Sequence, residues 1–301
     1  MSGNLKEVRT RIKSVNNTKQ ITKAMKMVSA AKLRRAQMAI TSMRPYADKL
    51  NAMLTNIVSN MDAAEISSEV KLAEERDVRN VLIVLVTSNR GLCGAFNANL
   101  QKQAIRLIQD KYKAQYDAGN VTMMPIGKKG YDFFRKRYDI SYLTDDLLLF
   151  DDLVFDNTAK VSSAILDKFI NGTYDAVEVV YARFRNAAVQ YFEAQRFLPI
   201  PKIEKDEEAV DSNMVADFTF EPSKPELLAT MVPSILKTQF HSYLLDTHAS
   251  EHGARMTAMD KASENADELL KELKITYNKA RQEAITKELT EIVSGAAALE
   301  G

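Results

Sequence analysis

The chain has 301 residues, of which 46% are hydrophobic and 27% are charged, a composition typical of a soluble folded protein with room for about two domains. Its longest unbroken apolar run, Val81–Val86, is far short of the roughly 20 residues that a bilayer-spanning helix needs, which excludes a transmembrane protein. One cysteine, Cys93, cannot form an internal disulfide, so we expect a reducing compartment. The net charge of +1 conceals a basic first segment, where eleven lysine and arginine residues between Met1 and Arg44 stand against one acidic residue, Glu7.

Residues 1–60 are predicted to form one long helix. From Leu5 onward, apolar residues recur in alternating steps of three and four, which is the heptad pattern of a coiled coil. A polar window between Lys19 and Ser29 interrupts the apolar stripe, and the same register resumes at Leu33. Pro45 is expected to kink the helix locally.

The basic residues of this helix admit three interpretations. Clusters of lysine and arginine neutralise phosphates and can bind nucleic acid, but no aromatic residue precedes Tyr46, so stacking on single strands is not indicated. A solvated helix face is the common case. The third interpretation is contact with other proteins around the rod, because Ile21, Met25 and Val28 form an apolar stripe rotated from the main one.

Residues 226–301 are predicted to form a second long helix. The same stepping runs from Leu245 to Ala284, after which the apolar stripe drifts to Ile285, Leu289 and Ile292. This segment is rich in acidic residues and so complements the basic first helix. We therefore predict that the two helices pair as an antiparallel intramolecular coiled coil.

Between the helices, residues 80–201 have the pattern of a central Rossmann-like α/β domain. The continuous apolar run at 80–87 suits a strand buried on both faces. Helices predicted at 95–116, 128–137 and 158–170 interleave with strands predicted at 121–126, 140–143 and 176–184, which is the order of a mostly parallel sheet. The strand predicted at 187–197 follows a two-residue link that is too short for a crossover, so it should pair antiparallel. Residues 61–79 and 202–225 are predicted connectors, and the fold class is α/β with a long antiparallel two-helix coiled coil.

A glycine-containing turn after the first strand invites a nucleotide-binding interpretation. Gly91 and Gly94 lie between a buried strand and a helix, but the third glycine of the dinucleotide motif is missing. Gly127-Lys128 cannot complete a phosphate loop, because no hydroxyl residue follows to reach a magnesium ion. Glycines of tight turns, in a sheet that binds no nucleotide, are the favoured interpretation.

The pattern His248-Ala-Ser-Glu-His252 matches the H-x-x-E-H motif of zinc peptidases, in which two histidines bind the metal and the glutamate activates water. A zinc metallopeptidase is therefore the alternative function. His252 falls on the heptad seam, where packing against the partner helix is favoured over an open cleft.

Three segments carry a resemblance to a known family: RIKSVNNTKQITKAMKMVSAAK at 11–32, NRGLCG at 89–94 and YNKARQEAITKELTEIVSGAAA at 277–298. In this order they closely resemble the γ subunit of rotary (F-type) ATP synthases, and the likeness covers nearly the whole chain. The resemblance implies a central rotor shaft that couples ion-driven rotation to ATP synthesis or hydrolysis at the β subunits. It also implies a non-catalytic subunit with no cofactor, no metal and no nucleic acid.

The resemblance implies partners and contact residues as well. The partners are the ring of α and β subunits, the ε subunit and the membrane rotor ring of c subunits. Shaft contacts to the α/β ring are expected at Lys19, Lys23, Met25, Lys26, Arg281, Gln282, Leu289 and Ile292. Contacts to the rotor ring or ε are expected at Phe218, Phe220 and Glu221. No extra cysteine pair and no transit peptide are evident, so we expect a bacterial complex, with the chain peripheral on the cytoplasmic face of the cell membrane.

Overall fold

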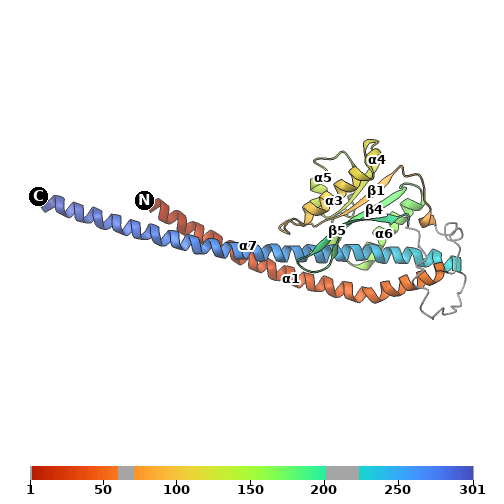
Figure 1. Ribbon diagram of the computed structural model, residues 1–301, viewed down its shortest axis with the longest axis horizontal. Coiled ribbons are helices and arrows are strands. Elements are labelled where there is room, and N and C mark those ends of the chain that lie inside the picture. Colours follow the sequence, from red (N-terminus) through yellow and green to blue (C-terminus); the bar gives the residue numbers. More distant parts are fainter. Residues whose placement is uncertain (1, 60–70, 201–223, 301) are drawn as a thin grey trace. The chain divides into compact units, whose positions relative to one another are not determined.

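Figure 1 shows the computed structural model of the chain, which describes residues 2–59, 71–200 and 224–300. A long helix at each end, α1 (Ser2–Ser59) and α7 (Lys224–Glu300), precedes and follows a five-stranded sheet and its helices. The predicted fold class is confirmed. The chain divides into two compact units: residues up to Ala31 with those from Arg255 onward form unit 1, and Lys32–Ala254 forms unit 2.

In unit 1, α1 and α7 pair antiparallel along a shared register. Lys19 forms an ion pair with Asp267, the Thr22 hydroxyl lies 2.7 Å from that of Ser263, and Lys26 Nζ donates to Asp260 Oδ1 at 2.5 Å. Residue numbers rise along one helix as they fall along the other, which is the predicted antiparallel coiled coil.

The side chains of α1 that are buried recur at heptad spacing, as predicted. They are Val8, Thr22, Ser29, Leu33, Ala36 and Ile40. Two of the six, Thr22 and Ser29, are polar and lie in the polar window. The buried seam of α1 therefore continues through the window. Pro45 lies inside the helix, and α1 runs on through it.

The sheet in unit 2 has the strand order β3-β2-β1-β4-β5. Its strands are β1 (Val81–Val86), β2 (Val121–Ile126), β3 (Ser141–Tyr142), β4 (Ala176–Phe184) and β5 (Gln190–Leu198). β1 pairs parallel with β2 and β4, β2 pairs parallel with β3, and β5 pairs antiparallel with β4, as the short link before it predicts.

Helices cover both faces of this sheet (Figure 1). On one face, Ile83 and Leu85 pack with Phe96 and Leu100 of α3 (Phe96–Asp110). On the other face, the alternate residues of β1 form a cluster with α6 (Phe155–Ile170) and with α7, which contributes Phe240. All six residues of β1 are buried, because both faces are covered. The part of α7 in unit 2 is therefore one layer of the α/β core.

Some predicted boundaries differ from the structure. The helix predicted at 95–116 ends at Asp110, and the short α4 (Lys113–Asp117) follows it. The last strand begins at Gln190 instead of Ala187, because the Asn186 side chain accepts hydrogen bonds from the backbone N–H groups of residues 188 and 189 and forms a turn. The other helical elements are α5 (Lys128–Phe134) and two short 3₁₀ helices, η1 (Lys71–Ala73) and η2 (Leu149–Asp152). Among the described helices, none combines the length and apolarity that crossing a membrane requires.

Candidate interaction surfaces and the sheet edge

The last turns of α7 form an overhang that no other helix faces among the described residues. In the shared register of unit 1, α1 begins close to the level of Ala284. Beyond this level, every residue of α7 with a described side chain is exposed. The exposed apolar residues are Ile285, Leu289, Ile292 and Val293, with exposed fractions of 48%, 57%, 68% and 66%. Apolar side chains grouped on a free helix mark a contact surface for another protein.

Two of the lysines predicted to meet partner subunits are engaged within the chain. Lys19 is paired with Asp267, and Lys26 with Asp260. The hydrogen bond from Lys19 is the main reason that the pKa of Asp267 lies below its usual range. Asp260 and Asp267 belong to the acidic residues predicted to complement the basic first helix, but their pairing with these two lysines was not predicted. A signal was present: Lys19 and Lys26 are seven residues apart on α1, and so are Asp260 and Asp267 on α7.

The other predicted shaft contacts have varied exposure. Lys23, Arg281 and Gln282 are exposed, whereas Met25 is half-buried. Within the described part of the chain, Lys23 makes no ion pair, although its charge also helps to lower the pKa of Asp267. These three exposed polar side chains are available to a partner.

The rotated apolar stripe of α1 faces outward at two of its three positions. Ile21 and Val28 are each 59% exposed, and Met27 beside them is 67% exposed. Since these side chains lie off the buried seam, they add an apolar surface on the outside of the helix pair. The predicted contacts Phe218, Phe220 and Glu221 lie outside the described residues.

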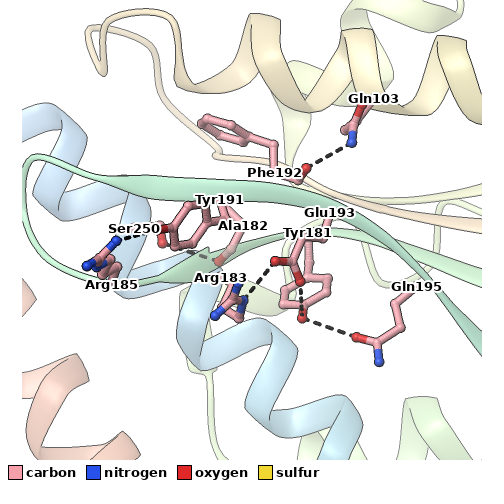
Figure 2. Close-up of polar contacts among 10 residues, drawn as sticks. All are labelled: Gln103, Tyr181, Ala182, Arg183, Arg185, Tyr191, Phe192, Glu193, Gln195 and Ser250. Carbon is pink, nitrogen blue, oxygen red and sulfur yellow. Dashed lines mark hydrogen bonds and ion pairs between the residues drawn. The ribbon is translucent and has the colours of Figure 1, made fainter.

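The sheet edge where nucleotide-binding folds hold their ligand is occupied by the chain itself. In an open sheet of this order, the ligand position lies at the carboxyl ends of β1 and β4, where connections leave on opposite sides. The β1–β4 register ends at Leu85 and Val180, so Ala182 lies beyond β1. There the Ala182 N–H donates to Thr247 Oγ1 at 3.2 Å. The Ala182 carbonyl accepts from Ser250 Oγ, also at 3.2 Å (Figure 2). Two hydroxyls of α7 thus satisfy the backbone N–H and carbonyl of β4 at a position that β1 does not reach.

Figure 2 also shows that the hairpin of β4 and β5 is tied by side chains on both of its strands. Gln103 Nε2 of α3 donates to the Phe192 carbonyl at 2.9 Å, and Arg183 Nε donates to Glu193 Oε1 at 2.8 Å. Ala182 and Phe192 face each other across the hairpin. The Phe192 carbonyl accepts from Gln103, and the Ala182 N–H and carbonyl bond to α7, so the two residues form a non-hydrogen-bonded pair.

Two glycines of the candidate phosphate loops, Gly94 and Gly127, have structural explanations. Gly94 has φ 61°, a left-handed conformation that suits glycine in a tight turn. Gly127 has φ 102°, and a Cβ there would lie 2.0 Å from the Thr87 carbonyl oxygen. Gly127 is therefore needed for the close approach of two backbone segments.

The histidines of the H-x-x-E-H pattern pack instead of opening into a cleft. His248 Nε2 and His252 Nε2 are 3.1 Å apart, and the His248 ring stacks on Phe150 with centroids 5.7 Å apart. His252 and Glu251 are buried, with exposed fractions of 5% and 6%. Over the described residues, no three side chains of histidine, cysteine, aspartate or glutamate are grouped to hold a metal ion. Nothing here supports a zinc peptidase.

A paired-helix rod with an exposed apolar tip, joined to an α/β core whose ligand edge is filled, defines a protein that acts through contacts with other chains. The family model described as ATP synthase matches residues 4–299. The ATP synthase gamma chain of Cytophaga hutchinsonii is 52% identical over 295 residues, covering 98% of both chains, and that of Flavobacterium psychrophilum is 49% identical over 299 residues, covering 99% of both. The chain belongs to the ATP synthase gamma chain family.

Solved structures agree on the fold. A chain of the Euglena gracilis mitochondrial ATP synthase, in a structure of OSCP, F1 and the c-ring, aligns with a TM-score of 0.64 and 22% identity, covering 99% of this chain and 95% of that one. A chain of the Tetrahymena thermophila mitochondrial ATP synthase central stalk and c-ring aligns with a TM-score of 0.56, covering 81% of this chain and 99% of that one. The γ-type central-stalk function predicted from the sequence is confirmed by the family match and the close relatives.

Proposed function

We propose that the chain is the rotor shaft of a bacterial F-type ATP synthase. The unit 1 helix pair turns inside a ring of α and β subunits, and the α/β core carries contacts to the ε subunit and the c-ring. The chain is peripheral on the cytoplasmic face of the membrane and has no catalytic role of its own. The observation that carries the proposal is the overhang of α7, where Leu289 and Ile292 are exposed on a helix that no other described element covers.

The chemistry of this overhang suits a rotating contact. Apolar contacts are non-directional, so a shaft can turn against an apolar collar without being trapped at one angle. The exposed polar residues, Lys23, Arg281 and Gln282, provide directional contacts to acidic or polar loops of the β subunits. Because the two helices differ in sequence, each rotational position offers a different set of contacts to each β subunit. Rotation then changes nucleotide affinity through differential contact energy.

Co-expression with α, β and ε chains tests this proposal. We expect a complex that contains all four chains and rotates on ATP addition, while the isolated chain hydrolyses no nucleotide. The isolated chain is the matched control, since the sheet edge that would hold a nucleotide is occupied by Thr247 and Ser250. ATPase activity that remains with the isolated chain through purification, or failure to join α and β subunits, would contradict the proposal.

A further inference from the structure

Three polar contacts lie at consecutive levels of the unit 1 seam. From the overhang inward they are the Lys19–Asp267 ion pair, the Thr22–Ser263 hydrogen bond and the Lys26–Asp260 ion pair, here called the polar lock. Thr22 and Ser263 are buried, with exposed fractions of 8% and 5%, and the charged pairs flank them at partly exposed positions. Toward the overhang the seam is apolar at Val8, and on the other side the next buried residue of α1 is Ser29, which is also polar.

Stability does not explain this arrangement. Ion pairs at partly exposed positions contribute little to the free energy of folding, because solvent screens them. A buried polar pair in a seam is often no more stable than an apolar layer of the same size. The polar lock therefore has a property, other than stability, that valine or leucine would lack at these positions.

What the polar contacts add is direction. Apolar side chains in a seam tolerate rotation of one helix against the other, because their attraction has no preferred angle. Hydrogen bonds weaken steeply away from their preferred geometry, so a helix turning about its own axis breaks them. The two ion pairs occupy equivalent heptad positions, on one side of the buried Thr22–Ser263 contact. Rotation of one helix against the other, in either sense, therefore moves donors away from acceptors at all three levels.

We propose that the polar lock couples α1 and α7 torsionally, so that torque received by the α7 overhang is shared with α1. This inference rests on the proposed rotor function. It assigns Lys19 and Lys26 to the internal coupling of the shaft, and it leaves Lys23, Arg281 and Gln282 as the partner-facing polar residues.

The test compares a neutral-lock variant with the unmodified chain in the assembled complex. The variant combines Asp260→Leu and Asp267→Leu with Thr22→Val and Ser263→Ala, which removes the acceptors of both ion pairs and the buried hydroxyls while nearly keeping side-chain size. Spin labels at the exposed positions Asn17 and Glu268, in a Cys93→Ser background, report the distance between the helices. Single-molecule fluctuation analysis reports the torsional stiffness of the shaft.

We expect a broader spin-label distance distribution and a lower torsional stiffness in the neutral-lock variant, with an unchanged melting temperature. Glu291→Gln is the matched control, because it removes an ion pair with Lys287 that lies within α7 alone. The double exchange Lys26→Asp with Asp260→Lys should restore the stiffness that Asp260→Lys alone removes. Unchanged stiffness and distance width in a neutral-lock complex that assembles and rotates would overturn the inference. If the unmodified chain fails to assemble or rotate, the proposed rotor function itself is contradicted.

Discussion

At the scale of single residues, Asp246 on α7 shows how the α/β core sets the ionisation of one carboxyl group. Burial raises the pKa of Asp246 to about 6, Arg44 and Arg183 oppose the rise, and Glu193 adds to it. Arg183 is hydrogen-bonded to Glu193 at 2.8 Å, so its charge is shared between two carboxylates. The arginines therefore do not compensate fully for the lost hydration of Asp246.

We predict that Asp246→Asn stabilises the chain at pH 7 by about 1–2 kcal/mol, a value discounted for partial exposure. The folded-state pKa lies above the unfolded value of 3.8, so the folded state retains a proton that the unfolded state loses as pH rises from about 4 to about 6. Stability is lost over this window in the unmodified chain and should be retained in the variant. Denaturant unfolding at several pH values measures the difference.

An exposed aspartate of α1 in the same unit provides the control. Asp48→Asn should change the free energy of unfolding little, since its side chain is exposed. If Asp246→Asn lowers stability at pH 7, attraction to Arg44 and Arg183 outweighs the cost of burial, and the assigned direction of the pKa shift is wrong.

At the scale of elements, α7 combines three environments along one helix. In unit 2 it contributes Phe240 to the core and hydroxyls to β4, and in unit 1 it pairs with α1. Beyond Ala284, its described side chains are exposed. Each environment follows from local chemistry: aromatic and aliphatic residues where the sheet is covered, small, apolar and a few polar residues in the seam, and exposed apolar residues among polar ones in the overhang. The hydroxyl contacts to Ala182 give the sheet-facing part of α7 a specific test.

We predict that Thr247→Val destabilises unit 2 by about 1–3 kcal/mol, because the Ala182 N–H then lies buried without an acceptor. The same range is expected for Ser250→Ala, which leaves the Ala182 carbonyl without its donor. Amide hydrogen exchange at Ala182 should accelerate in Thr247→Val. Thr247→Ser keeps the hydroxyl and should keep the slow exchange, so rapid exchange in both variants would show that packing of the threonine methyl is responsible.

The helices and strands could be predicted from the sequence because their signals are local. The apolar run of β1, the two-residue link before β5 and the heptad steps of α1 each depend on neighbouring residues, and all three predictions are confirmed. The partners of Lys19 and Lys26 lie more than 200 positions away along the chain, and choosing them requires the alignment of the two helices. The Thr247 and Ser250 contacts were equally hidden, since small hydroxyl residues on a helix carry no pattern that points to a strand.

At the scale of the whole molecule, the two compact units hold different kinds of surface. Unit 2 contains the sheet with its two buried clusters, whereas unit 1 combines a narrow seam with exposed apolar and polar groups. Unit 2 also exposes large apolar side chains, for example Leu92 and Phe155, which leaves surface for the contacts proposed for the α/β core. Within unit 1, the tip residues Leu289 and Ile292 are apolar, and the exposed residues Lys23, Arg281 and Gln282 are polar. The two sets predict different consequences when they are removed.

We predict that replacing Lys23, Arg281 and Gln282 together with alanine reduces ATP-driven rotation and proton pumping more than deletion of residues 289–301. Charge-assisted contacts contribute about 1.5–3 kcal/mol each when they are made, which is enough to bias the conformation of a β subunit. The tip contacts are apolar and interchangeable, so the deletion should lower assembly stability or speed while leaving some coupling. The deleted residues with described side chains are all exposed, so the remaining helix pair should stay folded.

Single-molecule rotation and proton pumping on both variants decide between the two surfaces, after each complex has been checked for full subunit composition. Lys279→Ala with Lys287→Ala is a suitable control, because it removes two positive charges from the same stretch of α7 and leaves the three polar residues in place. If the control loses as much torque as the triple variant, net charge and not directional contact is responsible. Near-normal torque in the triple variant with complete loss in the deletion would reverse the ranking and place the coupling at the apolar tip.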